Sequence, residues 1–174
     1  MPTIGVALAI PEPWATALQD YRTAVGDTTA SMIPTHITLV PPTEIADGEL
    51  PKIEAHLEEV ASQVEAFCVH LRGTGTFRPV SPVVFVTVAE GISRCEQLAA
   101  ALRRGPLEVD LQFPYHPHVT IAHHLPDEAL DRAFQELGDC ESVFDAGEFH
   151  LYVHDEQEGW QATRDFPLRS SGDG

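Results

Sequence analysis

The chain has 174 residues, 43% of them hydrophobic and 21% charged, a composition typical of one globular domain that excludes a disordered chain or a collagen-like repeat. Acidic residues outnumber basic ones by 27 to 10, and the net charge of −17 disfavours a broad nucleic-acid-binding surface or a basic membrane patch. No apolar run reaches the roughly 20 residues of a transmembrane helix. The three cysteines form no CxxC pair, which favours reduced thiols in the cytoplasm.

Strand and helix patterns alternate along the sequence. In chain order, the first half predicts a strand over 3–10, a helix over 12–25, a strand over 36–40 closed by Pro41-Pro42, a helix over 49–67, a strand over 67–71, a loop over 73–79 and a strand over 83–88. The rest predicts a helix over 93–104, a strand over 118–122, a helix over 127–137, a closing hairpin of 149–153 and 160–166, and a frayed tail over 170–174.

These elements predict an α+β fold. Their connections have mixed lengths, which favours antiparallel pairing over a doubly wound parallel sheet. The sequence contains no GxGxxG and no GxxxxGK[ST] motif, so a Rossmann or P-loop nucleotide site is excluded. We expect residues 1–169 to form a single domain.

One tetrapeptide occurs twice. His36-Ile37-Thr38-Leu39 returns 82 positions later as His118-Val119-Thr120-Ile121, and a proline precedes each copy. In a strand, the histidine and threonine of each copy lie on one face, about 6.6 Å apart, while the aliphatic residues point to the other face. If the two halves of the chain pack about a pseudo-twofold axis, two imidazoles and two hydroxyls line one cleft.

Such a cleft suits phosphodiester chemistry. In-line attack at phosphorus requires a base on the nucleophile and an acid on the leaving oxygen, and imidazole supplies either role near neutral pH. The hydroxyls of Thr38 and Thr120 can donate to the oxygens on which charge develops. This chemistry requires no metal and no other cofactor. The acidic composition further predicts that at least one of the two histidines has a pKa above the ordinary value.

The duplicated His-x-Thr-x motif resembles the signature of the 2H phosphoesterase superfamily, in particular its 2′-5′ RNA ligase and cyclic nucleotide phosphodiesterase branch. The segments 75–79, 82–88 and 151–168 are similar to the middle region and the closing hairpin of that family. The resemblance implies a bilobal pseudo-twofold fold, in which two antiparallel sheets line a central cleft and helices lie outside. It also implies that His36 and His118 form the acid-base pair and that Thr38 and Thr120 hold the phosphate.

Three further residues are candidates for contacting the substrate. Arg78 and His123 match regions near the site of the family, where many relatives carry an arginine in place of His123. Tyr115, like Phe85, could stack on a base. For all of them the alternative is an ordinary structural role, a surface charge for Arg78 and packing for the aromatic residues.

The remaining histidines offer two other interpretations. His116, His118, His123 and His124 invite a metal site, but their strand parity differs and no cysteine or carboxylate lies at zinc spacing, so no metal is predicted. His150 and His154 share one strand face and either edge the cleft or face solvent; solvent is the favoured interpretation.

We therefore interpret the chain as a monomeric, cytoplasmic phosphodiesterase. Its expected partners are a cyclic nucleotide or an RNA terminal phosphate, with no membrane contact. It would hydrolyse a 2′,3′-cyclic phosphate or a 2′-5′ linkage. The alternative is a module that binds a nucleotide or terminal phosphate without turnover.

Overall fold

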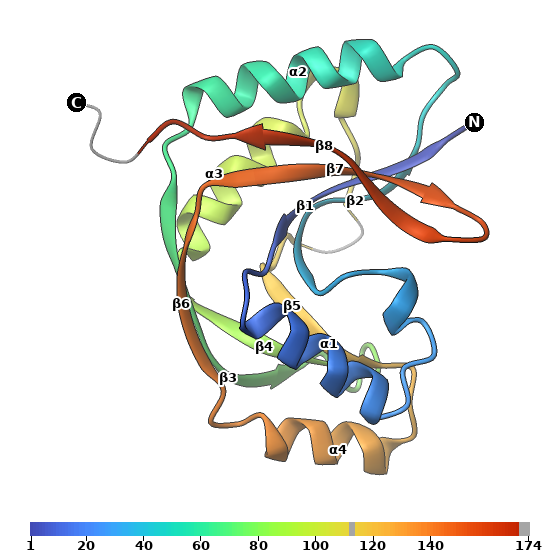
Figure 1. Ribbon diagram of the computed structural model, residues 1–174, viewed down its shortest axis with the longest axis vertical. Coiled ribbons are helices and arrows are strands. Elements are labelled where there is room, and N and C mark those ends of the chain that lie inside the picture. Colours follow the sequence, from blue (N-terminus) through green and yellow to red (C-terminus); the bar gives the residue numbers. More distant parts are fainter. Residues whose placement is uncertain (112–113, 171–174) are drawn as a thin grey trace.

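An antiparallel sheet of eight strands forms the framework of the computed structural model, which describes residues 1–111 and 114–170 (Figure 1). The strands are β1 (Thr3–Ala9), β2 (His36–Glu44), β3 (Phe67–Thr76), β4 (Val83–Glu90), β5 (His118–His123), β6 (Glu141–Ala146), β7 (Glu148–Asp155) and β8 (Gly159–Pro167). The helices are α1 (Trp14–Ala24), α2 (Leu50–Gln63), α3 (Ile92–Leu102) and α4 (Asp127–Glu136), and the 3-10 turns are η1 (Ala30–Met32) and η2 (Gly105–Leu107).

The sheet consists of two similar halves. Its strand order is β6-β3-β4-β5-β2-β1-β7-β8, and β5 meets β2 at the centre through the pair Val119 and Ile37. Helices α2 and α3 pack on the half that contains β2, whereas α1 and α4 pack on the half that contains β5. Figure 1 shows α2 and α4 at opposite ends of the molecule with the sheet between them. The predicted α+β fold with antiparallel pairing is thus confirmed, and the two expected sheets are the two halves of one continuous curled sheet.

The halves of the sheet are not halves of the chain. The half with β2 takes β1, β7 and β8 from the two ends of the sequence, and the half with β5 takes its strands from residues 67–146. Each half of the sheet is therefore built from segments that are interleaved in the sequence. As a result, β1 and β7, from opposite ends of the chain, lie side by side.

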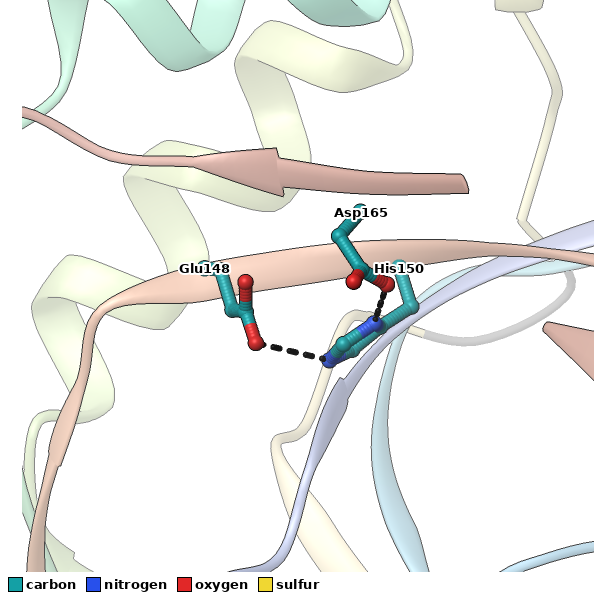
Figure 2. A group of neighbouring side chains, drawn as sticks. All are labelled: Glu148, His150 and Asp165. Carbon is teal, nitrogen blue, oxygen red and sulfur yellow. Dashed lines mark hydrogen bonds and ion pairs between the residues drawn. The ribbon is translucent and has the colours of Figure 1, made fainter. Parts of the chain in front are cut away.

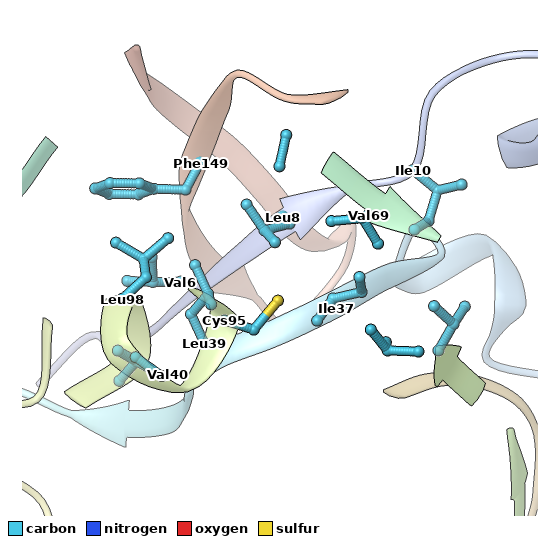
Figure 3. Packing of buried hydrophobic residues seen from close by; sticks show 14 of the residues in the cluster. Val6, Leu8, Ile10, Ile37, Leu39, Val40, Val69, Cys95, Leu98 and Phe149 are labelled. Carbon is cyan, nitrogen blue, oxygen red and sulfur yellow. The ribbon is translucent and has the colours of Figure 1, made fainter. Parts of the chain in front are cut away.

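Side chains on the central strands β2 and β5 alternate between the two faces of the sheet, and burial of the aliphatic residues decides which face each one takes. Ile37, Leu39, Val119 and Ile121 are fully buried. Figure 3 shows Ile37 and Leu39 among residues of β1 and α3 in the hydrophobic core. Burial of each such side chain contributes about 1.5–3 kcal/mol. Because that gain fixes which face of the strand turns inward, the histidines and threonines between them must face the opposite side.

Some boundaries differ from the sequence-based prediction. Strand β2 continues through Pro41-Pro42, because Thr43 and Glu44 pair with β1 after a shift in register. Strand β3 continues to Thr76 through part of the predicted loop, because residues 74–76 pair with β4. Strand β6 was not predicted at all. All other strands and the four helices lie where the sequence placed them, within a few residues.

The end of the described chain is tied to the body of the protein. Arg169 bridges to Glu65, and its amide donates to the carbonyl of Val64 at 2.9 Å. The frayed tail predicted over 170–174 lies, apart from Ser170, outside the described residues. Among the helices of the described part, none has the length and apolar character needed to cross a membrane.

Candidate active site

The two copies of the motif lie side by side and antiparallel at the centre of the sheet. The pair Ile37 and Val119 sets their register. Continuing that register by one residue in each direction sets His36 opposite Thr120 and Thr38 opposite His118. All four side chains are half-buried and turn to the face opposite the core. The fold thus brings together the four residues that the sequence predicted as one site.

Both histidines are oriented in the same way. Nδ1 of His36 lies 2.7 Å from the carbonyl oxygen of Pro34, and Nδ1 of His118 lies 2.6 Å from that of His116. A carbonyl only accepts hydrogen bonds, so Nδ1 carries the proton in each ring and Nε2 is left with a lone pair. In His36 this Nε2 lies 3.1 Å from the hydroxyl of Thr38. Each motif therefore presents one basic nitrogen.

Burial lowers the pKa of both histidines. For His36, the charges of Arg22 and His118 lower the pKa further, and the hydrogen bond to Pro34 opposes them. For His118, the neighbouring His116 lowers it further, and the hydrogen bond to the His116 carbonyl opposes. The expectation that the acidic composition raises at least one of these pKa values is wrong. The net charge belongs to the whole surface, whereas the rings sense desolvation and nearby cations.

A buried ion pair supports the loop that carries His36. The Nη1 atom of Arg22, on α1, donates to the carbonyl oxygen of Ile33 at 2.8 Å and to the hydroxyl of Thr35 at 3.2 Å. These residues flank Pro34, whose carbonyl orients His36. Arg22 is therefore a positioning residue for His36.

Asp27 completes this pair and links it to the other half of the sheet. Its Oδ2 lies 3.4 Å from Nη2 of Arg22 and 3.4 Å from Nε2 of His123, at the end of β5. The side chains of Arg22 and Asp27 are only 4% and 3% exposed. Burial alone would raise the pKa of Asp27, but hydrogen bonds from Thr29 and the charges of His123 and Arg22 lower it overall. The sequence did not reveal Arg22 or Asp27, since a polar helix residue and a loop aspartate are usually solvated.

Aromatic rings surround His118. The ring of Phe77 lies 4.9 Å away, nearly perpendicular at 88°, and the ring of Phe85 lies 5.2 Å away. His116 follows at 5.8 Å. Gly75 makes room for this cluster, because a Cβ atom there would lie 2.7 Å from the ring of Phe85. The sequence analysis considered Phe85 but missed Phe77.

An apolar pocket opens beside His36 and Thr38. Tyr152 and Trp160, from β7 and β8, form one wall, and a Cβ atom added at Gly5 would contact Trp160 at 3.5 Å. The other residues that line it are Val6, Ala7, Ile33, Pro34, Val40 and Pro42. The pocket is thus suited to a flat apolar group next to His36 and Thr38.

A family model described as the 2′-5′ RNA ligase superfamily matches residues 10–158, which include both motifs. The chain belongs to this superfamily. A protein of Halalkalibacterium halodurans that is named as a phosphoesterase is 31% identical over 126 residues, 72% of this chain and 72% of its own length. A relative from Bacillus cytotoxicus, named in the same way, is 30% identical over 142 residues, 79% of this chain and 81% of its own length.

Solved structures of the 2H phosphoesterase type share the fold. TT0787 of Thermus thermophilus superimposes with a TM-score of 0.67 at 23% identity, covering 98% of this chain and 100% of its own. Escherichia coli LigT in complex with 3′-AMP gives 0.65 at 18% identity, covering 97% and 99%. Usb1 of Kluyveromyces marxianus gives 0.57 at 16% identity, covering 95% and 98%. Together with the superfamily match and the relatives named as phosphoesterases, the shared fold makes this chain a 2H phosphoesterase.

The three further candidates for substrate contact, Arg78, Tyr115 and His123, make different contacts in this fold. Arg78 turns toward α4, where Nη1 lies 2.8 Å from Asp131 and 4.0 Å from Asp127. Tyr115 donates its hydroxyl to the backbone carbonyl of Thr38 at 2.7 Å, and burial raises its pKa. A direct substrate contact by Arg78, Tyr115 or His123 stays a prediction; the observed contacts of Tyr115 and His123 support the two motif strands.

The remaining histidines considered from the sequence of this 2H phosphoesterase lie at the end of β5 and on β7. The rings of His123 and His124 meet edge to face, with centroids 5.1 Å apart, and His123 is held by Asp27. His154 is exposed, as expected. His150 departs from the favoured interpretation, because its side chain is only 14% exposed and lies between two carboxylates.

Proposed function

We propose that the protein hydrolyses a 2′,3′-cyclic phosphate, at an RNA end or on a small nucleotide, or a 2′-5′ phosphodiester bond. The proposal depends chiefly on one observation, the antiparallel apposition of the two motifs with an unprotonated Nε2 in each histidine. Two-histidine acid-base catalysis accounts for such a reaction without a metal. RNA ends are the substrate class that the superfamily description supports.

The reaction takes one proton from water and gives one to the ribose oxygen. Nε2 of one histidine accepts a proton from water as its oxygen attacks phosphorus. The bond from phosphorus to a ribose oxygen breaks, and the other histidine, protonated at Nε2, donates its proton to that oxygen. The hydroxyls of Thr38 and Thr120 donate to the non-bridging oxygens as their charge grows.

The lowered pKa values fit these roles once substrate is bound. A neutral imidazole in the free protein is ready to act as the base. The negative charge of the incoming phosphate favours protonation of the other ring, which makes it the acid. Both rings present Nε2, so either histidine can take either role.

The apolar pocket beside His36 supports a nucleoside substrate. Tyr152 and Trp160 offer flat surfaces on which a base can stack. The fold is shared with LigT, whose structures were solved with 3′-AMP, NADP+ and ATP.

We also propose that the protein acts as a monomer in the cytoplasm, where Cys68, Cys95 and Cys140, all free in this structure, stay reduced.

Turnover of a 2′,3′-cyclic mononucleotide by the purified protein, in the presence of a chelator, tests the function. His36→Gln and His118→Gln should each lower kcat by roughly 10²- to 10⁴-fold, because each removes one proton-transfer group. His70→Gln, which changes a histidine on β3 away from both motif strands, is the control and should retain full activity. Thermal unfolding of each variant confirms that it is folded.

Three results would overturn the proposal. Activity that survives either motif substitution excludes two-histidine catalysis. Activity that chelation abolishes and zinc restores indicates a metallohydrolase. Tight binding of the nucleotide without turnover indicates a binding module. A panel that includes a 2′-5′ dinucleotide separates hydrolysis of cyclic esters from cleavage of 2′-5′ linkages.

A further inference from the structure

Three potential metal ligands lie together on β7 and β8, outside the catalytic motifs. Glu148 and His150 are two residues apart on β7, and Asp165 is the direct partner of His150 on β8. Residues so spaced share one face of a sheet. Figure 2 shows the ring of His150 between the two carboxylates. One ligand atom from each of the three side chains lies within 4.8 Å of the others.

Asp165 fixes the orientation of the His150 ring. Nδ1 of His150 lies 2.6 Å from Oδ1 of Asp165. A carboxylate that accepts from one ring nitrogen directs the lone pair of the other nitrogen outward, which is the usual arrangement behind metal-bound histidine. The His150 side chain is only 14% exposed, so the ring has little freedom to turn away.

The outward nitrogen faces a second carboxylate at a distance suited to a shared ion. Nε2 of His150 lies 3.8 Å from Oε1 of Glu148, which is too long for a hydrogen bond. Zinc binds nitrogen and carboxylate oxygen at about 2.0–2.2 Å, so one ion fits between these atoms with a small movement of Glu148. Glu148 is 48% exposed and free to make that movement.

We propose that Glu148, His150 and Asp165 form a binding site for one divalent transition-metal ion, with Zn²⁺ as the best match to the ligand set. His150 Nε2 and Glu148 bind the ion, and Asp165 orients the histidine. Water completes the coordination shell, for which a neighbouring hollow lined by Ala9, Pro11, Ala146 and Gly147 leaves room.

The charge of the cluster favours a cation. With the imidazole neutral, as metal binding requires, the two carboxylates leave a charge of about −2 beside a shielded ring. The chain as a whole carries −17. An anion is therefore a poor occupant, and a divalent ion compensates the charge.

The proposed site is separate from the catalytic pair. Ala7 of β1 pairs with Thr38 on one side and with His150 on the other, so the three residues form one row across the sheet. His150 thus lies two strand spacings, about 10 Å, from Thr38 at the backbone. An ion there is too far away to touch the reacting phosphorus, and turnover of a cyclic mononucleotide should be unchanged by His150→Gln.

Calorimetric titration of the full chain with Zn²⁺ at pH 7.5 tests the site. We expect His150→Gln to lose one binding event that the wild type has, while His154→Gln, an exposed histidine on the same strand, keeps it. Asp165→Asn should weaken that event by about 10- to 100-fold, the usual effect of losing the partner of a histidine ligand. The motif variants His36→Gln and His118→Gln should keep it.

Two outcomes would overturn the proposal: an unchanged number and affinity of bound ions in His150→Gln, or no wild-type binding event at micromolar zinc. Titration with Co²⁺ adds a spectroscopic readout, since its visible absorption should appear in the wild type and be lost in His150→Gln. These binding measurements do not depend on turnover, so failure of the proposed phosphodiesterase activity leaves their outcome intact.

Discussion

The two halves of the site hold equivalent histidines by different means. Around His36, charged and hydrogen-bonding groups dominate, with buried Arg22 anchoring the residues on either side of Pro34. Around His118, the rings of Phe77 and Phe85 take that place. In both halves the pKa of the histidine falls, chiefly through burial. An ionic and an aromatic environment thus both lower the pKa of the histidine that they surround.

The two halves share the local contact that orients the histidine, and they differ in the tertiary contacts that surround it. In each, Nδ1 of the histidine binds the carbonyl of the residue two positions earlier. That contact needs only the short segment before the strand. The ion pair comes from α1 and the loop that follows it, and the aromatic cluster comes from β4 and the segment before it. The orientation of each motif histidine is therefore set by the short segment before its strand, while the contacts that stabilise the ring differ between the halves.

Breaking the ion pair of the His36 half should have the largest effect on stability. Asp27→Asn leaves the buried guanidinium of Arg22 without a counter-charge, and we expect a loss of about 3–5 kcal/mol in the free energy of unfolding. The pKa of Asp27 is lowered in the folded protein, so its stabilisation is present above the ordinary carboxyl pKa. The difference between variant and wild type should therefore shrink as pH falls below about 4.

Urea unfolding at pH 7 and at about pH 2.5, below the ordinary carboxyl pKa, measures both effects. Arg164→Gln is the control, because Arg164 pairs with Glu54 and Glu58 on the surface and its loss should be far less costly. Equal losses for Asp27→Asn and Arg164→Gln would contradict the structural role of the buried pair. Should Asp27→Asn fail to fold, Thr29→Ala, which removes the 2.6 Å hydrogen bond to Asp27, gives a milder change in the same direction.

Crowding the aromatic cluster tests the His118 half. In Gly75→Ala the new Cβ atom would meet the buried ring of Phe85 at 2.7 Å, so the ring must shift next to His118. Overpacking of this kind costs about 1–3 kcal/mol, and kcat should fall with it. Gly147→Ala is the matched control, since a Cβ atom there would have no neighbour within 4 Å.

Chemical unfolding and kcat for a 2′,3′-cyclic nucleotide, measured on both glycine variants, test the predicted loss of stability and activity. If Gly147→Ala is as harmful as Gly75→Ala, the close packing inferred around His118 is wrong.

The elements that sequence reasoning found are those with a strong local signal. Alternation of Ile37 and Leu39 with polar residues predicted both the strand and the face on which His36 and Thr38 lie. Strand β6 was missed because its apolar contrast is weak: Ser142 is buried on one face, while Val143 is 51% exposed on the other. It lies at the edge of the sheet, where one neighbouring strand suffices to hold it.

The features that sequence reasoning missed depend on packing between distant segments. Arg22 and Asp27 look solvated in the sequence and become buried only because the segment 26–35 folds back over α1. The predicted rise in histidine pKa failed for a similar reason. Net charge acts over a screened distance of roughly 8–10 Å, whereas desolvation acts directly on the ring and requires knowledge of its neighbours.

The smallest change we expect is the most informative about mechanism. Phe77→Leu uncovers one side of the His118 ring, so the pKa of His118 should rise toward its ordinary value while that of His36 stays in place. In the pH profile of kcat/KM, the rising limb reports the base, which must be neutral, and the falling limb reports the acid, which must be protonated. A shift of the falling limb to higher pH identifies His118 as the acid, and a shift of the rising limb identifies it as the base.

Nuclear magnetic resonance titration of the histidine ring protons ties that shift to a residue. Phe134→Leu, a change of a partly exposed phenylalanine on α4, should move neither histidine nor either limb. If the pKa of His36 moves as much as that of His118 in Phe77→Leu, the two rings titrate as one coupled pair, and the division between an ionic and an aromatic half does not extend to their protonation. If only His118 moves, the limb that follows it assigns the acid and the base, which the symmetric orientation of the two rings leaves open.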